Sequence, residues 1–263
     1  MSATDTFRQL HGAGIFLLPN AWDAGSARYL EWRGVDAVAT TSSGFAATLG
    51  RHDQNVSRDE LLRHAEQLAG AISIPLSVDS ERCYADDPEG VAETVRLLAA
   101  TGAAGCSIED YDPASDAIDP MPLAVERTEA AATEAARHGL VLTARAENHL
   151  YGVDDLDDTI ARLVAFREAG AEVLYAPGLT DLDQIASVVA KVGAPVNVLA
   201  TPRGPSVEAL GSVGVRRVST GGALAWAALG GLRDAVDELL ADGTSGYLAR
   251  ALRGADRNAA FDR

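Results

Sequence analysis

Two hydrophobic patterns alternate along the chain. Short runs of apolar and β-branched residues, typical of buried strands, are separated by longer segments in which apolar residues recur every three or four positions, as in amphipathic helices. Eight short runs are expected to form strands, at residues 15–18, 37–41, 74–78, 104–108, 140–143, 172–175, 195–199 and 217–219. Eight strand–helix units over 263 residues predict a (β/α)8 TIM barrel. A doubly wound open sheet is the alternative, because alternation alone does not show that a sheet closes.

Several residues mark where the predicted helices begin and end. Ser57 and Glu60 have the spacing of a capping box, and Asp87-Pro88 suits a cap followed by proline in the first turn. Glycine stands at many helix-to-strand junctions, namely at Gly34, Gly102, Gly139, Gly170, Gly193 and Gly214. Glycine is favoured there because a helix often closes on a residue in the left-handed conformation.

The end of the chain carries apolar helix in excess of what a barrel needs. The segment Ala223 to Leu240 is rich in alanine and leucine and predicts one helix, and residues 243–252 predict a further short helix. We expect residues 1–263 to form a single barrel domain, with 223–263 as a helical extension. The surplus apolar surface of this extension is expected to pack against a second copy of the chain, in a homodimer or homotetramer.

The charge of the chain excludes some classes of partner. There are 22 Lys and Arg residues against 38 Asp and Glu, a net charge of −16, which argues against binding to nucleic acid or to an anionic membrane surface. Two cysteines suggest a reducing compartment. The polar first residues and the lack of a long apolar run favour a cytoplasmic protein without a membrane span.

Charged side chains gather where three predicted strands end. Asp79 and Glu81 follow the third strand, Glu109 follows the fourth, and Arg145 follows the fifth. In a barrel these positions share one face, and carboxylate oxygens are the ligands that hard cations prefer. An arginine beside a metal is a suitable receptor for a small dicarboxylate or a 2-oxo acid. The pattern therefore predicts a site for a small anionic substrate.

A structural interpretation of the same residues stays open. Asp79 and Glu81 are also placed to cap the helix that follows the third strand. Glu109 is equally suited to a buried ion pair with Arg145, which would put both residues in the same pocket without any metal.

Six short motifs resemble the isocitrate lyase/phosphoenolpyruvate mutase superfamily. They are PNAWD at 19–23, TSSGF at 41–45, GRHD at 50–53, VDSE at 78–81, IED at 108–110 and AR at 144–145. The resemblance extends from about residue 17 to residue 229, with the motifs in the order of the family. It implies a (β/α)8 barrel, often with a C-terminal helix exchanged between subunits, and a Mg²⁺ site for 2-oxo-acid or enolate chemistry.

The resemblance also implies a role for each matching residue. Asp79 would bind Mg²⁺ directly, and Glu81 and Glu109 would hold the water molecules of the metal. Asp53 would lie near metal and substrate, and Arg145 would contact the anionic end of the substrate. The predicted catalytic residues are Asp53, Glu109 and Arg145; the predicted substrate-binding residues are Ser43, Gly44, Phe45, Arg145 and Asn197; and the predicted metal ligands are Asp79, Glu81 and Glu109.

One departure from the family narrows the expected reaction. The lyase branch carries a catalytic cysteine in the loop after the fourth strand, but residues 110–121 contain no cysteine, lysine or histidine. Cys83 lies near the motif at 78–81 and is a weaker candidate for a thiol role. The expected function is a Mg²⁺-dependent lyase that acts on a small 2-oxo acid or hydroxy-dicarboxylate by C–C cleavage or decarboxylation through an enolate. The alternatives are P–C chemistry of the phosphonopyruvate type, or a non-catalytic barrel that binds a 2-oxo acid.

Overall fold

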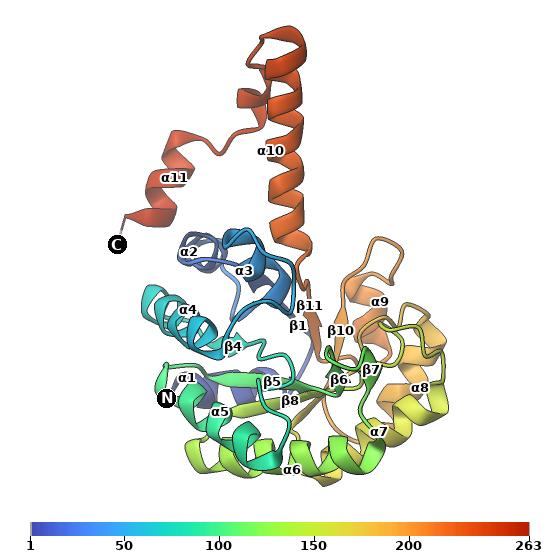
Figure 1. Ribbon diagram of the computed structural model, residues 1–263. Helices are drawn as coiled ribbons and strands as arrows, with labels where there is room; N and C mark the ends of the chain where they lie inside the picture. The colour runs from blue at the N-terminus through green and yellow to red at the C-terminus, as the bar shows by residue number, and fades with distance from the viewer. Residues whose placement is uncertain (1, 263) are drawn as a thin grey trace.

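The parallel strands form one closed barrel in the computed structural model, which describes residues 2–262 (Figure 1). The strands are β1 (Phe16–Leu18), β2 (Asn20–Ala21), β3 (Val38–Thr40), β4 (Leu76–Val78), β5 (Gly105–Glu109), β8 (Val141–Arg145), β9 (Val173–Tyr175), β10 (Val196–Leu199) and β11 (Arg217–Ser219). Their order in the sheet is β1-β11-β10-β9-β8-β5-β4-β3-β2.

The first strand of the barrel is divided in two. β1 pairs with β11 and β2 pairs with β3, so the segment from Phe16 to Ala21 joins the two edges of the sheet. Pro19 separates the two parts because proline has no N–H to donate to a sheet ladder. The (β/α)8 barrel is confirmed, and each of the eight predicted strand segments overlaps an observed strand.

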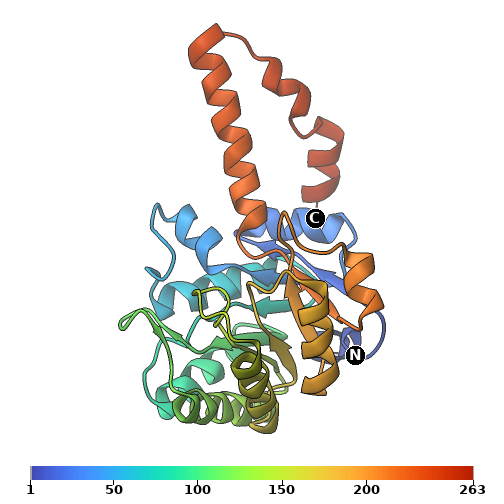
Figure 2. The same cartoon turned by 90° about the vertical axis from the view of Figure 1, so that its right-hand side faces the viewer.

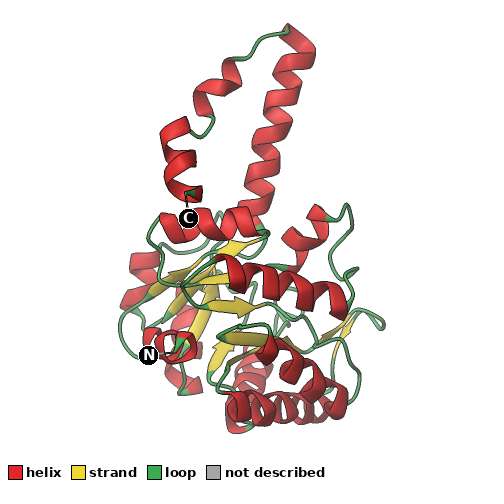
Figure 3. Cartoon of the chain, turned by 90° about the vertical axis from the view of Figure 1, so that its left-hand side faces the viewer, coloured by secondary structure: helices red, strands yellow, loops and turns green. Residues whose placement is uncertain are grey.

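Helices surround the strands on the outside (Figure 3). Those between the strands are α2 (Ala24–Trp32), α3 (Ser42–Thr48), α4 (Arg58–Ala71), α5 (Pro88–Ala100), α6 (Met121–His138), α7 (Leu156–Glu168), α8 (Leu182–Val192) and α9 (Val207–Ser212). The predicted capping box of Ser57 and Glu60 is formed at the start of α4, and Asp87 caps α5. Gly139 and Gly193 close α6 and α8 in the left-handed conformation.

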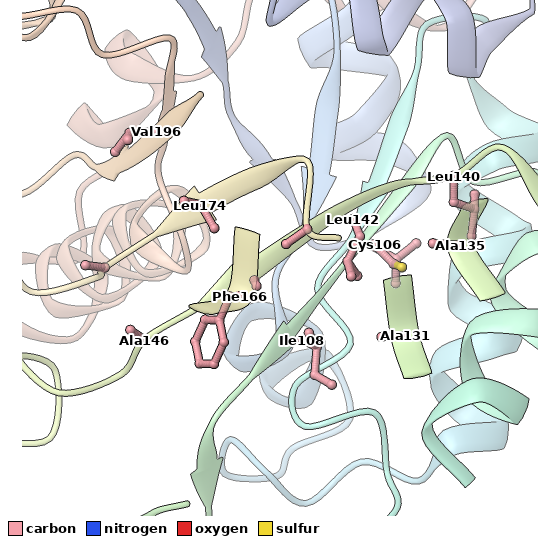
Figure 4. Packing of buried hydrophobic residues seen from close by; sticks show 14 of the residues in the cluster. Cys106, Ile108, Ala131, Ala135, Leu140, Leu142, Ala146, Phe166, Leu174 and Val196 are labelled. Carbon is pink, nitrogen blue, oxygen red and sulfur yellow. The ribbon is translucent and has the colours of Figure 1, made fainter. Parts of the chain in front are cut away.

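The core lies mainly between the strands and the surrounding helices. Cys106, Ile108, Leu142 and Leu174 project from neighbouring strands into one apolar cluster with Phe166 of α7 (Figure 4). The first helix, α1 (Ala3–Leu10), adds Phe7 to a second cluster with Phe16 and Leu18. The strands are buried on both faces, which suits a parallel sheet covered by helices. The barrel is therefore a rigid frame for the side chains at its open end.

The end of the chain stands away from the barrel. The helix α10 (Ala223–Asp242) projects outward, and the chain returns through the 3₁₀ turn η1 (Gly246–Arg250) and α11 (Gly254–Phe261), which packs against α2 (Figures 1 and 2). The helix predicted from residue 223 to 240 is confirmed. The segment expected to form a second helix at 243–252 contains the 3₁₀ turn instead, because the Glu238 side chain accepts hydrogen bonds from Thr244 and Gly246.

Among the helices of residues 2–262, none is long and apolar enough to cross a membrane. Met1 and Arg263, the two ends of the predicted single domain, lie outside the described residues.

Candidate active site

A cavity of about 290 Å³ lies at the carboxyl ends of the barrel strands. Five of the predicted site residues line it, namely Ser43, Asp53, Asp79, Arg145 and Asn197. Parallel strands all point their carboxyl ends to the same face, so residues far apart in the sequence meet there. The cavity is of a size for a small acid rather than for a large cofactor.

Arg145 is the centre of the charged cluster. Its Nη1 lies 2.9 Å from Asp79 Oδ1 and 3.1 Å from Glu109 Oε2, and its Nε lies 2.7 Å from Glu147 Oε1. Glu109 and Arg145 are direct partners in the register of β5 and β8, which explains why these two side chains meet. Arg145 also lies over the ring of Tyr175, 5.4 Å from its centre.

Glu147 is a member of this cluster that is absent from the predicted site residues. Its side chain is fully buried and pairs with Arg145, while its Oε2 has no hydrogen-bond partner. The available signal was the spacing of two residues from Arg145, since side chains at i and i+2 point to the same side of an extended segment. That spacing places a carboxylate next to the guanidinium.

Asp79 is held at the mouth of the cavity by its neighbours. Its backbone N–H donates to Thr40 Oγ1 at 2.8 Å, and its Oδ2 accepts from the backbone N–H of Ser42 at 3.1 Å. Ser107 Oγ lies 3.4 Å from Oδ1. These contacts come from β3, the start of α3 and β5, so the position of the carboxylate is determined by three elements.

Glu81 lies in a turn with unusual backbone conformation. Glu81, Cys83 and Tyr84 all have positive φ angles, of 48°, 62° and 54°, in the left-handed region that side chains other than glycine rarely adopt. Glu81 is buried, and its Oε1 has no hydrogen-bond partner. Burial, together with the charges of Asp79 and Asp53, raises the pKa of Glu81 to about 8. The turn therefore presents a carboxyl group whose ionised form is poorly compensated by its surroundings.

Burial also affects the pKa values of other carboxyl groups in the cluster, those of Glu109 and Asp53. Burial raises the pKa of Glu109 well above its usual range, although Arg145 opposes the shift, and Gln54 Nε2 donates to its Oε1 at 3.1 Å. Burial also raises the pKa of Asp53. Asp53, Asp79, Glu81, Glu109 and Glu147 interact electrostatically with one guanidinium, that of Arg145. The cluster therefore carries an excess of negative charge when its carboxylates are ionised.

The motif at 41–45 includes the start of a short helix. Residues 42–48 form the short helix α3, with Thr41 as its cap, and Ser43 faces the cavity. Gly44 packs closely, because a Cβ atom at this position would lie 2.6 Å from Thr41 Cγ2 and 3.2 Å from the Cβ of Ala225 in α10. Phe45 stacks on His64 with ring centres 3.7 Å apart. Gly44 and Phe45 are absent from the lining of the cavity.

The segment after β5, the fourth of the predicted strands, is a small antiparallel hairpin. It is formed by β6 (Tyr111–Asp112) and β7 (Ala117–Ile118). Arg162 pairs with Asp110 at one end of the hairpin, and Arg82 pairs with Asp119 at the other. Tyr111 stacks on Tyr151, with ring centres 3.5 Å apart. Buried arginines thus fix the hairpin at both of its ends.

The two thiols do not replace the absent cysteine of the lyase loop. Cys83 and Cys106 are both fully buried, and burial raises the pKa of Cys83 to about 12. A thiol that stays protonated and has no access to solvent does not suit acid–base catalysis near neutral pH.

The geometry has features of both the metal-site interpretation and the ion-pair interpretation of the carboxylates. The ion pair between Glu109 and Arg145 is formed, as the structural interpretation expected. Within residues 2–262, no group of three or more His, Cys, Asp or Glu side chains is arranged to hold a metal ion, since the Arg145 guanidinium lies among the carboxylates. The chemistry of the donors still fits a hard cation, because three buried or half-buried carboxylates lie together and one oxygen of Glu81 lacks a partner.

Comparison with known proteins agrees with this architecture. The family profile described as phosphoenolpyruvate phosphomutase matches residues 7–240. A candidate lyase/mutase from Burkholderia cenocepacia J2315 has a crystal structure that superposes with a TM-score of 0.95 at 48% identity, covering 99% of this chain and 96% of that one.

Two curated relatives extend the comparison. An uncharacterized protein of Mycobacterium tuberculosis H37Rv is 34% identical over 82% of this chain and 81% of its own length. The 2-methylisocitrate lyase of Escherichia coli K12 is 31% identical over 61% of this chain and 56% of its own length. Homologues of the chain are thus carbon–carbon lyases and mutases, as predicted. The chain belongs to the phosphoenolpyruvate phosphomutase family, within the isocitrate lyase/phosphoenolpyruvate mutase superfamily that its ordered motifs predicted.

Proposed function

We propose that this protein is a Mg²⁺-dependent lyase that breaks a C–C bond of a small 2-oxo acid or hydroxy-dicarboxylate. The observation that carries the proposal is the cluster at the mouth of the cavity, where Arg145 lies within 3.1 Å of Asp79 and Glu109. Such a cluster offers oxygen ligands to a cation and a guanidinium to a substrate carboxylate in one place. Relatives named 2-methylisocitrate lyase and oxaloacetate decarboxylase support the reaction class.

Mg²⁺ would be held by Asp79, Glu81 and Glu109. The excess of carboxylates over guanidinium groups favours a cation here, since buried negative charge without compensation is costly. A bound Mg²⁺ would act as a Lewis acid toward the oxygen atoms of the substrate. The residues of the chain would set where that substrate lies.

Arg145 would bind a carboxylate of the substrate. Its planar guanidinium is suited to a two-pronged contact with a carboxylate, and its pKa is raised further by neighbouring carboxylates, so it stays charged. A cation bound by Asp79 and Glu109 would compensate these carboxylates and release the guanidinium for the substrate. Ser43 and Asn197 line the same cavity and would orient the rest of the molecule.

Decarboxylation makes the smallest demand on the side chains present. When CO2 leaves a β-keto acid, both electrons of the broken C–C bond stay on the remaining fragment, and no base has to remove a proton in that step. The hairpin that replaces the lyase loop brings no cysteine, lysine or histidine to the cavity, and both thiols are buried. The proposal therefore favours loss of CO2 over the retro-aldol reaction. P–C chemistry is a second candidate, which the description of the matching family profile supports.

The experiment is a product assay with purified protein. The panel comprises oxaloacetate, 2-methylisocitrate, isocitrate, 2,3-dimethylmalate and phosphonopyruvate, each with Mg²⁺, and released pyruvate or glyoxylate is measured. EDTA and the variant Glu109→Gln are the controls. We expect product from one member, lost in both controls. Turnover that persists in EDTA would contradict the metal dependence, and tight binding of 2-oxo acids without any product would favour a non-catalytic binding protein.

We further propose that the protein is a homo-oligomer assembled through α10. Five apolar side chains spaced three or four residues apart lie 40–58% exposed along this helix, namely Trp226, Leu229, Leu232, Val236 and Leu239. Such a stripe is the face that a helix normally buries. A second copy of the chain is the partner that we propose for it.

A further inference from the structure

Arg217 is a buried cation inside the barrel. It lies at the start of β11 and is 3% exposed. Its Nε donates to Asn197 Oδ1 at 2.9 Å, its Nη2 donates to Thr143 Oγ1 at 3.0 Å, and its Nη1 lies 3.3 Å from His11 Nε2. These contacts use three of the five N–H groups of the guanidinium.

The partners of Arg217 are all uncharged. Asn197 and Thr143 carry no charge, and burial together with the positive charge of Arg217 lowers the pKa of His11 to about 3, so this histidine is neutral at physiological pH. His11 Nδ1 lies 2.9 Å from the Phe7 carbonyl oxygen, to which it donates, which leaves Nε2 as the acceptor for Arg217. No side chain in this shell therefore compensates the guanidinium.

The other buried arginines are different. Arg82 pairs with Asp119, Arg127 lies 3.5 Å from the same carboxylate, and Arg162 pairs with Asp110 and Asp158. Across the part of the chain that the structure describes, Arg217 alone among the buried arginines has no carboxylate within 4.0 Å. A buried charge without a partner is costly, which indicates that an anion can complete this site.

Arg217 also borders the cavity of the candidate active site. The lining includes Arg217, Thr143, Asn197 and Ser219 together with Asp79 and Arg145 at the mouth. Because β11 runs toward the mouth, Arg217 lies two residues deeper than Ser219, about 6–7 Å along the strand. The cavity therefore has a guanidinium at its inner end and a second one among the carboxylates at its mouth.

We propose that Arg217 forms an anion-binding subsite at the inner end of the cavity, which takes one carboxylate of the substrate. The identity of the ligand rests on the proposed function, whereas the subsite itself does not. The subsite selects for a substrate with two carboxylates, one near Arg145 and one at Arg217, over a monocarboxylic 2-oxo acid. A small inorganic anion such as chloride could also pair with the guanidinium of Arg217. The test therefore distinguishes a substrate carboxylate from an inorganic anion.

The test measures anion binding without turnover. Thermal unfolding is followed in chloride-free buffer with EDTA while succinate or chloride is added. Arg216→Gln is the matched control, because Arg216 is the neighbouring residue and contacts the Gly14 carbonyl at the surface. We expect succinate to raise the melting temperature of the wild type and of Arg216→Gln with the same apparent Kd, and the apparent Kd to rise at least tenfold in Arg217→Gln. An unchanged Kd in Arg217→Gln would overturn the subsite.

A second variant keeps the test valid if Arg217→Gln does not fold. Asn197→Asp places a carboxylate where Asn197 Oδ1 already accepts from Arg217, so the guanidinium gains a counter-charge within the fold. We expect this variant to fold and to lose the response to succinate; a response equal to that of the wild type would overturn the proposal. If chloride stabilises the wild type and succinate does not displace it, the subsite binds an inorganic anion. That result would overturn the assignment of the subsite to a carboxylate of the substrate. Because no product is measured, absence of lyase activity would leave these results unaffected.

Discussion

Replacement of Arg127 by methionine is expected to destabilise the turn that carries Glu81. Arg127 lies in α6 and is 1% exposed. Its Nη1 donates to the carbonyl oxygens of Ala85 and Asp86 at 2.6 and 2.8 Å, and its Nη2 donates to the carbonyl oxygen of Arg82 at 2.6 Å. One guanidinium thus holds three backbone carbonyls of a segment that contains left-handed residues.

The size of the expected loss of stability follows from the groups that lose a hydrogen-bond or ionic partner in Arg127→Met. Methionine fills a similar volume but donates no hydrogen bond, so three carbonyl oxygens and Asp119 lose a charged partner. Loss of one partner from a buried charged network costs about 3–5 kcal/mol. In a chain of this size, each kcal/mol corresponds to roughly 2–4 °C in melting temperature. We therefore expect a fall of about 6–20 °C for Arg127→Met.

Thermal unfolding followed by circular dichroism measures this change. Arg96→Met is the matched control, because Arg96 is exposed on α5 and pairs with Glu93 of the same helix. A surface pair of this kind contributes about 0–1 kcal/mol, so the control should shift by no more than about 4 °C. A shift in Arg127→Met as small as that of the control would refute the assigned role of Arg127.

Two further predictions concern other parts of the molecule. His11 is neutral in the folded state with a pKa of about 3 and titrates near 6.5 when unfolded, so stability is complete above pH 6.5 and falls as the pH decreases below it. Urea unfolding should therefore show wild-type stability falling about 2 kcal/mol more than that of His11→Gln between pH 7 and pH 5, and parallel curves would contradict this assignment. Leu232→Glu places a charge on the apolar stripe of α10, where Leu232 is 58% exposed, and should convert the oligomer to monomer in light scattering after gel filtration. A mass unchanged by Leu232→Glu, or a monomeric wild type, would contradict assembly through α10.

The alternation of strands and helices could be predicted from the sequence because barrel strands are buried on both faces and read as short apolar runs. The meeting of Glu109 and Arg145 could also be predicted, since residues that end neighbouring parallel strands lie side by side. Asp79 lines the cavity for the same reason, because it directly follows β4. Their positions depend on backbone topology, which the hydrophobic pattern determines.

Other features depend on where long side chains reach, which no local pattern determines. Arg127 contacts a turn more than forty residues earlier in the chain. Arg217 lacks a carboxylate partner because its neighbours on β8 and β10 are Thr143 and Asn197. The helix at 42–48 is absent from the predicted elements, because it is short and its cap, Thr41, directly follows a buried strand. Side-chain direction and local capping limited the prediction here.

Calorimetric titration of the purified protein with Mg²⁺ measures directly whether the carboxylates at the mouth of the barrel hold this cation. Wild type and Asp79→Ala are titrated at the same pH after treatment with EDTA and removal of the chelator. We expect saturable binding of Mg²⁺ to the wild type and its loss in Asp79→Ala, because Asp79 is the proposed direct ligand. An affinity for Mg²⁺ that is the same in both proteins would contradict the site.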